Sequence, residues 1–322
     1  MEMDSVRLGS TGLRVSEFCL GTAMFGREMG DHLAATPEES HAILDAFADA
    51  GGNFIDTANT YADGRSEEII GEWLNERDRE EFVIASKAYW NRISPLNENL
   101  SRPALRTELE GTLDRLDTSY LDIYYIHRWD DDTPIAETLS TLDDFVHEGK
   151  VNYLGISTAA AWKLTKALWT SDVEGLERFE VAQPKFNAAY REDVQSYLDV
   201  TVDQTLAVVP YSPLEGGFLT GKYERDQDAP EGSRGAISEW DGFEKRQWAV
   251  LDTVKAVAEE CDTDPAVVAL RWLADHNRVT TPILGARTRE QIEENLQAVT
   301  CTLTDNQRDR ISDAYFEARQ RE

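Results

Sequence analysis

The stretch Gly51-Gly-Asn-Phe-Ile-Asp-Thr-Ala-Asn-Thr-Tyr61 places a carboxylate and a phenol just after a short apolar run. Residues 53–55 predict a buried strand that ends at Asp56, and Tyr61 lies in the loop that follows. A helix capped by Ser66 is expected next. Taken alone, Asp56 also suits a turn and Tyr61 a packed loop, so the other strand ends must decide their role.

Strands and helices alternate along the rest of the chain. Strands are expected at 18–22, 53–56, 82–87, 121–127, 151–155, 180–183, 206–210 and 280–284. Helices are expected at 37–50, 66–77, 98–117, 135–148, 159–170, 192–204, 245–260, 265–277, 289–298 and 305–319. Such alternation requires parallel strands, in either an open doubly wound sheet or a closed barrel.

Eight strands, and no G-x-G-x-x-G motif after the first of them, favour the barrel. We therefore expect an α/β fold, a (β/α)8 TIM barrel with an N-terminal β-hairpin at 5–20 and extra C-terminal helices. No Pro/Ser-rich linker interrupts residues 1–322, which predicts a single domain. Segment 212–243 is long enough to be a functional loop.

The charge is strongly acidic, with 61 Asp and Glu against 32 Lys and Arg and a net charge of −29. Only 8 of the basic residues are lysines. Such a surface repels nucleic acids and anionic membranes, so we expect neither as a partner. An acidic, lysine-poor surface is typical of proteins from cytoplasm of molar salt and predicts a halophilic source; an ordinary acidic mesophile is the alternative.

The cysteines and histidines do not have the spacing of a metal or disulfide site. The 3 cysteines lack a C-x-x-C pair and are expected to be small buried hydrophobes. No metal site is expected among the histidines, which are His32, His41, His127, His147 and His276. The stretch Met1–Ser5 lacks the positive region and apolar run of a signal peptide, and no run approaches ~18 apolar residues, so we expect a cytoplasmic protein.

Polar side chains stand at the carboxyl ends of several expected strands. Asp56, Lys87 and His127 end three consecutive strands, and the later strands end with Ser157, Gln183, Tyr211 and Ser212. In a barrel these ends meet at one mouth. A lysine or a histidine that closes an apolar run is costly unless it is paired, so the sequence predicts a polar site there.

Together these side chains suit proton transfer to a carbonyl oxygen. Asp56 can pair with Lys87, and the ammonium beside Tyr61 would lower a phenol pKa that is ordinarily ~10. Tyr61 would then be a general acid, while His127 would orient a carbonyl and stabilise the charge that develops on its oxygen. The set is suited to protonating an alkoxide while a hydride arrives at carbon.

These motifs resemble those of the aldo-keto reductase superfamily from about residue 5 to residue 300. They are Gly52–Ala58 with Tyr61, Ser86-Lys87, Asp122–His127, Tyr211-Ser-Pro-Leu214 and Leu284–Asn295. By this resemblance Asp56, Tyr61, Lys87 and His127 form a catalytic tetrad. Residues 215–223 most resemble the branch of potassium-channel β-subunits and bacterial general reductases.

The resemblance implies a nicotinamide cofactor. Ser157 and Gln183 would hold its carboxamide, and Tyr211 would stack on its ring. The remaining cofactor residues implied are Gly21, Thr22, Ser212, Leu214, Lys222, Arg234, Gly285, Arg287, Gln291, Glu294 and Asn295. Among them Lys222 would meet the pyrophosphate, and the arginines with Gln291 the adenosine phosphate. Glu294 and Asn295 would take the adenine amino group. Arginines clustered in so acidic a chain favour NADPH over NADH; the alternative is that they are solvated and paired with local acids.

The substrate side is less specific. Met24, Tyr89, Trp90 and Trp129, together with Phe25, lie in loops after strands, where they would wall an apolar pocket or simply pack the loops. Two residues depart from the family pattern: Thr158, where Asn or Arg is usual, and Phe186, where Tyr is common.

We therefore expect an NADPH-dependent reductase of aldehydes or ketones, with Tyr61 as the proton donor. One alternative is an NADP(H)-sensing regulatory subunit with little turnover, and another is an NAD-linked sugar or polyol dehydrogenase. Beyond a small carbonyl compound, the sequence predicts neither the substrate nor the oligomeric state.

Overall fold

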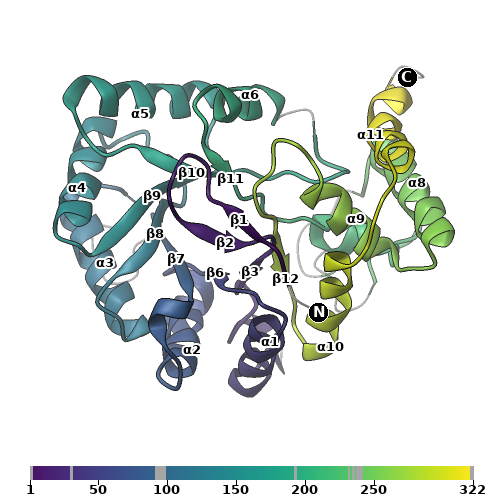
Figure 1. Cartoon of the computed structure of the whole chain (residues 1–322), viewed down its shortest axis with the longest axis horizontal. Coiled ribbons are helices and arrows are strands. Elements are labelled where there is room, and N and C mark those ends of the chain that lie inside the picture. Colours follow the sequence, from purple (N-terminus) through teal and green to yellow (C-terminus); the bar gives the residue numbers. More distant parts are fainter. Residues whose placement is uncertain are drawn as a thin grey trace.

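The computed structural model has eight parallel strands at its centre and helices around them (Figure 1). It describes residues 3–29, 32–90, 99–191, 194–230, 233, 236 and 242–319. The strands of the central sheet are β3 (Cys19–Gly21), β6 (Phe54–Asp56), β7 (Val83–Ala88), β8 (Leu121–Ile126), β9 (Val151–Ser157), β10 (Phe179–Gln183), β11 (Ala207–Val208) and β12 (Ile283–Gly285).

The strand order is β11-β10-β9-β8-β7-β6-β3-β12, so β11 and β12 are its two ends. Backbone hydrogen bonds join these ends. The amides of Thr280 and Thr281 donate to the carbonyl of Val208 at 2.8 and 3.3 Å, and the amide of Ile283 donates to that of Pro210 at 3.0 Å. The strands therefore close on themselves, which confirms the barrel.

Helices cover the outside of the barrel. They are α1 (Pro37–Asp49), α2 (Arg65–Leu74), α3 (Arg102–Leu116), α4 (Ile135–His147), α5 (Ala161–Glu174), α6 (Gln195–Asp203), α8 (Lys245–Cys261), α9 (Pro265–Ala274), α10 (Arg289–Leu296) and α11 (Asp305–Arg319). Helices α8 and α11 pack together beyond α9 and are the predicted extra helices (Figure 1). In the part of the chain that the structure describes, every helix is too short or too polar to cross a membrane.

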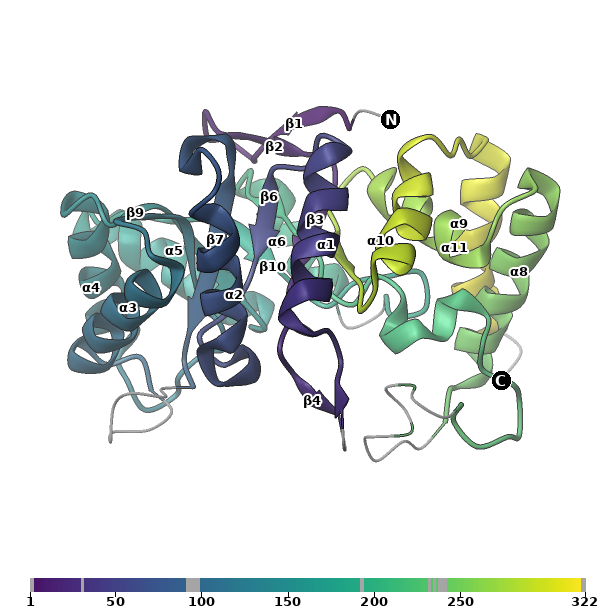
Figure 2. The ribbon, with the colours of Figure 1, turned by 90° about the horizontal axis from the view of Figure 1, so that it is seen from below.

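The alternation of side chains along each strand divides the barrel into layers. In β6, Phe54 belongs to the cluster inside the barrel, whereas Ile55 belongs to the cluster that faces the helices. The hairpin of β1 (Ser5–Arg7) and β2 (Arg14–Ser16) lies across one end of the barrel, as predicted (Figure 2). Leu8 and Val15 fill that end of the barrel with apolar side chains. The carboxyl ends of the strands, where the polar side chains stand, are at the opposite end.

Several predicted helix boundaries were wrong by two to four residues, including the N-terminal cap of α2 and the end of α5. Gly64, with φ of 93°, caps α2. The expected cap, Ser66, is instead buried in the first turn of the helix, because the helix begins at Arg65 and its cap lies two residues earlier than predicted. The Ser66 hydroxyl donates to Thr22 Oγ1 at 2.8 Å. Helix α5 does not end near residue 170 but continues to Glu174, where Gly175 adopts the left-handed φ of 70° that ends helices.

Several short elements were not predicted, among them a second hairpin and short 3-10 helices. A hairpin of β4 (Glu28–Met29) and β5 (His32–Leu33) follows β3 and extends from the end of the barrel opposite β1 and β2 (Figure 2). The 3-10 helix Glu215–Thr220 lies within segment 212–243, which was expected to be irregular.

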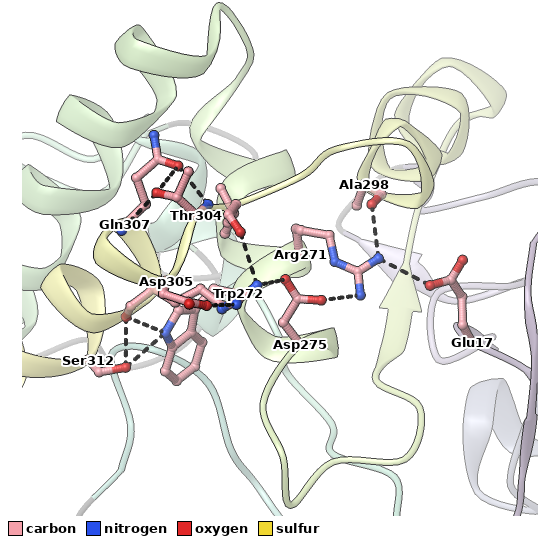
Figure 3. Close-up of polar contacts among 11 residues, drawn as sticks. Glu17, Arg271, Trp272, Asp275, Ala298, Thr304, Asp305, Gln307 and Ser312 are labelled. Atoms are coloured by element: carbon pink, nitrogen blue, oxygen red, sulfur yellow. Dashed lines mark hydrogen bonds and ion pairs between the residues drawn. The ribbon is translucent and has the colours of Figure 1, made fainter.

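A polar network ties the C-terminal helices to the barrel (Figure 3). Arg271 of α9 pairs with Glu17, just before β3, at 3.1 Å and with Asp275 at 2.6 Å. The indole of Trp272 donates to Ser312 of α11 at 3.1 Å. Because α9 contacts both neighbours through adjacent residues, α11 is held against the barrel wall.

Candidate active site

Asp56 and Tyr61, from segment 51–61, meet Lys87, from the next strand, at the polar end of the barrel. The ammonium of Lys87, at the end of β7, pairs with Asp56 Oδ1 at the end of β6. It also donates to Thr57 O at 2.8 Å and to the phenol oxygen of Tyr61 at 3.2 Å. Lys87 is completely buried and Asp56 is 2% exposed, so this cluster is screened very little by water.

The Lys87 ammonium keeps its charge in this position. Burial by itself would lower its pKa, but the carboxylate of Asp56 and the oxygen of Tyr61 outweigh the burial and raise that pKa above the ordinary value. For Asp56 burial prevails and raises the pKa of the carboxyl above its ordinary value, although Lys87 and Gln183 partly offset this effect. A positive charge therefore lies within hydrogen-bonding distance of Tyr61.

His127 follows β8 and completes the group of strand-end residues. Burial, and then the charge of Lys87, hold the pKa of its imidazole well below 6.5, so the ring is neutral at physiological pH. Its ring lies edge-on to Tyr61, with ring centres 5.9 Å apart. Its buried Nδ1 has no hydrogen-bond partner among the residues described.

An unusual turn holds Tyr61. Ala62, Asp63 and Gly64 have φ angles of 48, 57 and 93°, three left-handed residues in succession. Two of them carry side chains, and such a conformation persists only where the surroundings enforce it. Gly64 is required, since a Cβ there would lie 2.7 Å from the Arg115 side chain.

The same arginine belongs to a buried polar network behind the site. Arg115 pairs with the fully buried Glu67 at 2.7 Å, and Glu67 accepts a hydrogen bond from Ser86 at 2.5 Å. Ser86 precedes Lys87 in β7 and points the opposite way, toward the helices. Glu67 and Arg115 had not been predicted as support, because their role depends on contacts between α2, α3 and β7.

Gln183 connects the two sides of the barrel mouth. Its amide nitrogen donates to Asp56 Oδ2 at 2.7 Å, so both carboxylate oxygens of Asp56 have partners. The carbonyl of Gln183 accepts from Ser157 Oγ at 3.1 Å. In the strand order, β10 and β6 are four strands apart in a ring of eight, and Gln183 therefore reaches across the barrel.

Two cations lie near each other on the other side of the mouth. The Lys222 side chain is exposed, but partial desolvation of its ammonium, and then the charge of Arg287, lower its pKa. Gly217, with φ of 89°, leaves room for this lysine, because a Cβ there would lie 2.7 Å from Lys222 Nζ. Two neighbouring positive groups on loops at the barrel mouth fit a phosphate-bearing ligand.

The loop before Lys222 is anchored by side chains that sequence reasoning did not select. Glu215, with φ of 48°, accepts from Lys185 and from Asn187, both at 2.6 Å. Asn187 also donates to Ser212 O at 2.8 Å. The segment after β10 therefore fixes the loop after β11, a contact that no local pattern reveals.

The residues expected at the adenosine end lie around the start of α10. The amide of Arg287 donates to Gln291 Oε1 at 3.0 Å. Asn295 is buried and donates to Gly285 O at 3.2 Å, which joins α10 to the end of β12, while Glu294 is exposed. Arg234 lies outside the described residues.

The other expected cofactor residues lie at the ends of β3 and β11. Thr22 donates from its amide and its hydroxyl to Asp56 O, at 3.0 and 3.1 Å, and Gly21 leaves room for Ile283. The half-buried segment Tyr211, Ser212 and Leu214 follows β11, and the amide of Tyr211 donates to Pro184 O at 3.0 Å.

The aromatic residues expected at the substrate side separate into two groups. Trp90 lies edge-on to His127, with ring centres 4.7 Å apart, and Tyr89 lies 5.1 Å from Trp90. Trp129 is 8% exposed and belongs to the core, with the Lys163 ammonium 5.5 Å from its ring. Among the other loop residues, Met24 is half-buried and Phe25 is fully buried in the core.

The two departures from the family pattern have different surroundings. Thr158 has φ of 46°, a left-handed conformation that Asn adopts readily and β-branched residues avoid. Phe186 is fully buried against Trp272 and His276, with ring centres 6.1 and 4.9 Å away. Thr158 is therefore a strained position near the site, whereas Phe186 is part of the core.

Comparison with known proteins agrees with this geometry. A sequence model of the Aldo/keto reductase family matches residues 17–315. The chain belongs to the aldo/keto reductase family. Like other members, it is an oxidoreductase. Norsolorinic acid reductase B of Aspergillus parasiticus is 36% identical to it over 95% of this chain and 82% of its own length.

Further relatives confirm the predicted branch of the family. A probable voltage-gated potassium channel subunit beta of Oryza sativa is 34% identical over 92% of this aldo/keto reductase chain and 91% of its own. The aryl-alcohol dehydrogenase [NADP(+)] of Phanerodontia chrysosporium is 31% identical over 94% of this chain and 83% of its own.

Proposed function

We propose that this aldo/keto reductase uses NADPH to reduce aldehydes or ketones to alcohols, with Tyr61 as the proton donor. The observation that carries the proposal is the buried Lys87 ammonium, bonded to Asp56 and 3.2 Å from the Tyr61 phenol. A cation in this place favours the phenolate that remains once the proton has left. The relative named for NADP(+) and an aryl alcohol supports the same chemistry.

Each member of the cluster has a distinct part in the proposed reaction. Bound NADPH would supply the hydride that reaches the carbonyl carbon. Tyr61 gives its proton to the carbonyl oxygen, and Lys87 stabilises the phenolate that results. Asp56 keeps Lys87 charged and in place, and the neutral His127 helps to orient the carbonyl.

The cofactor side of the mouth suits NADPH. Gln183 and Ser157 would hold the carboxamide, and Tyr211 would lie against the nicotinamide ring. Lys222 would meet the pyrophosphate, and Arg287 with Gln291 the phosphate on the adenosine. Partial desolvation and the repulsion from Arg287 both lower the pKa of Lys222. An anion between the two cations would offset this repulsion, which favours the more highly charged NADPH over NADH.

The substrate is proposed to have an apolar, flat body. Trp90 and Tyr89 place two aromatic rings next to His127, where the carbonyl would be oriented. Edge-to-face contacts with such rings favour aromatic aldehydes over small polar ones.

The replacement Tyr61→Phe tests the function. It removes the proton donor and keeps the ring, so carbonyl-dependent oxidation of NADPH should fall by ~10²–10⁴-fold. The dissociation constant of NADPH, followed by fluorescence, should change little. Activity that stays within a few-fold of the native enzyme with a panel of aromatic and aliphatic aldehydes would show that Tyr61 is not the proton donor.

A second candidate is a regulatory subunit that binds NADPH with little turnover. It is favoured by the relative from Oryza sativa that is named a channel subunit. Mixing the native chain, preloaded with NADPH, with the aldehyde panel in a single-turnover experiment separates the two. Rapid loss of NADPH absorbance supports the reductase, and its absence with every aldehyde supports the subunit.

A further inference from the structure

Large apolar side chains are exposed on one outer face of the barrel. Among the described residues, five large hydrophobic side chains are exposed, and four of them lie on α5 or α6. These are Trp162, Trp169 and Val173 of α5, at 62, 64 and 64% exposure, and Val202 of α6, at 58%. Helices α5 and α6 pack side by side on the outside of the barrel (Figure 1), so the four define one surface, here named the α5–α6 face.

The exposed residues of α5 have the spacing of a helix-pairing seam. Trp162, Lys166, Trp169 and Val173 are separated by four, three and four positions. This 3-4 spacing places them in one stripe, as in the a and d positions of a coiled coil. All four are exposed in the single chain. The stripe therefore presents an apolar seam with one lysine in it.

We propose that the α5–α6 face binds a second copy of this chain, with the two α5 helices antiparallel about a twofold axis. An antiparallel pairing centred between Ala167 and Leu168 places Trp162 opposite Val173 of the second copy. The same register places Lys166 opposite Trp169. Each apolar residue of the seam then meets the seam of the other copy, as a closed twofold interface requires.

The charges on α5 select this orientation. In a parallel twofold pairing every seam residue would face its own copy, and the two Lys166 ammonium groups would repel each other. In the antiparallel pairing each Lys166 lies over the ring of Trp169 of the second copy, where a cation is attracted. Lys163 and Asp172, at the edge, also face each other across the axis, although each is already paired within its own chain, with Asp131 and Arg178.

The area of the α5–α6 face approaches the lower size limit of specific dimer interfaces. Tryptophan buries ~150–250 Å² when covered, so two tryptophans and two valines at these exposures give roughly 800 Å² of apolar surface over both copies. The polar side chains around them raise this toward the ~1,200 Å² at the low end of specific interfaces. The twofold axis also brings α6 against α6, so Val202 extends the apolar surface.

The same arrangement predicts that salt controls the association. Each copy carries a net charge of −29, and the exposed Asp199 and Asp203 stand on either side of Val202. At ~0.1 M salt the Debye length is about 10 Å, and at 1 M it is about 3 Å, so repulsion between the copies is screened only in concentrated salt. The dimer should therefore form at molar KCl and dissociate on dilution of the salt.

Sedimentation velocity of the full chain tests the proposal. We expect a dimer at molar KCl and a shift toward monomer at ~0.1 M. Trp169→Lys places the new ammonium group opposite Lys166 of the second copy. The variant should weaken association by at least about tenfold. The matched control is Phe316→Lys, which changes an exposed aromatic on α11 and should leave association unchanged. A native chain that is monomeric at every salt concentration, or a dimer that survives Trp169→Lys, overturns the proposal.

Cysteine crosslinking tests the orientation in the same salt. Neither Trp162→Cys nor Val173→Cys should form a disulfide-linked dimer by itself. An equal mixture of the two variants should form one, because position 162 faces position 173 of the second copy. Crosslinking of each variant with itself would indicate a parallel pairing and overturn the antiparallel one. The native chain, with Cys19 buried and Cys261 and Cys301 partly buried, is the control for background oxidation. Unchanged melting temperatures show that the variants fold.

Discussion

The two sides of the barrel mouth differ in how far they are assembled without a ligand. On the side of β6 and β7, Asp56, Lys87 and Tyr61 are already joined to one another, and the ion pair is buried. On the side of β11 and β12, Lys222 is exposed and lies near a second cation, Arg287. Opposite charges stabilise the first cluster, whereas the two like charges of the second repel each other. The geometry of the proposed catalytic cluster is thus part of the fold, whereas in our proposal the second cluster completes its contacts only when a phosphate group binds.

The largest expected difference between the sides is in stability. Lys87→Met leaves the Asp56 carboxylate buried without its cation, and the free energy of unfolding should fall by about 3–5 kcal/mol in urea titrations. The double variant Lys87→Met/Asp56→Asn removes the uncompensated charge and should recover part of the loss. A decrease of less than about 1 kcal/mol for Lys87→Met would show that the Lys87–Asp56 pair contributes little to the stability of the fold.

The second effect concerns cofactor affinity. Lys222→Ala should leave the free energy of unfolding within about 0.5 kcal/mol of the native value, because the side chain is exposed. The NADPH dissociation constant, measured by fluorescence, should rise about tenfold as one charge-assisted contact is lost. Lys245→Ala, at another exposed lysine, is the matched control. Equal affinity of the two variants would remove Lys222 from the cofactor site.

A smaller effect is expected at the boundary between the two sides. Thr158 follows β9, which lies between β7 and β11 in the strand order, and has a strained φ of 46°. Its neighbour Ser157 donates to Gln183, the partner of Asp56. Thr158→Asn should raise the free energy of unfolding by about 1 kcal/mol, because Asn tolerates this conformation. Thr158→Val, which remains β-branched, should give no such gain. A stabilisation by Val equal to that by Asn would point to the lost hydroxyl rather than to the backbone.

The smallest expected effect is in the pH dependence of turnover. The pKa of His127 is held well below 6.5, so this ring stays neutral as the pH falls through the range where an ordinary histidine is protonated. The profile of kcat/KM between pH ~6 and 8 should therefore show no limb from His127 near 6.5. In the unfolded chain the same ring binds a proton below ~6.5, so the histidine also makes folding less favourable as the pH decreases below that value. A limb near 6.5 that disappears in His127→Asn would contradict the neutral ring.

The sequence predicts the barrel and the convergence of Asp56, Lys87 and His127 because both follow from local periodicity and from the rule that parallel strand ends meet. The contact between Gln183 and Asp56 depends instead on which strands face each other across a closed barrel. The role of Ser66 was wrongly predicted for a related reason. A serine near the start of a helix can cap that helix or donate a hydrogen bond to a different loop, as Ser66 does to Thr22.

The exposed seam of α5 was not predicted, because the predicted helix ended about one turn too early. With the helix ended near residue 170, Val173 falls outside it, and the 3-4 spacing of tryptophans and lysine loses its last member. Exposure was also needed to recognise the seam, because an apolar stripe on a helix of an α/β fold is ordinarily its buried face. Only the packed barrel shows that α5 buries a different stripe, which includes Leu164 and Leu168.

The hydrogen bond between Gln183 and Asp56 spans the mouth of the barrel. Its acceptor belongs to β6 and its donor to β10 on the opposite wall, so the donor–acceptor distance depends on the width of the barrel. The carboxylate that positions Lys87 is consequently sensitive to any widening or flattening of that cross-section, even one that begins in a helix on the outside. Substitutions in the outer helices can therefore change the position of Lys87 and, through it, of Tyr61, the proposed proton donor.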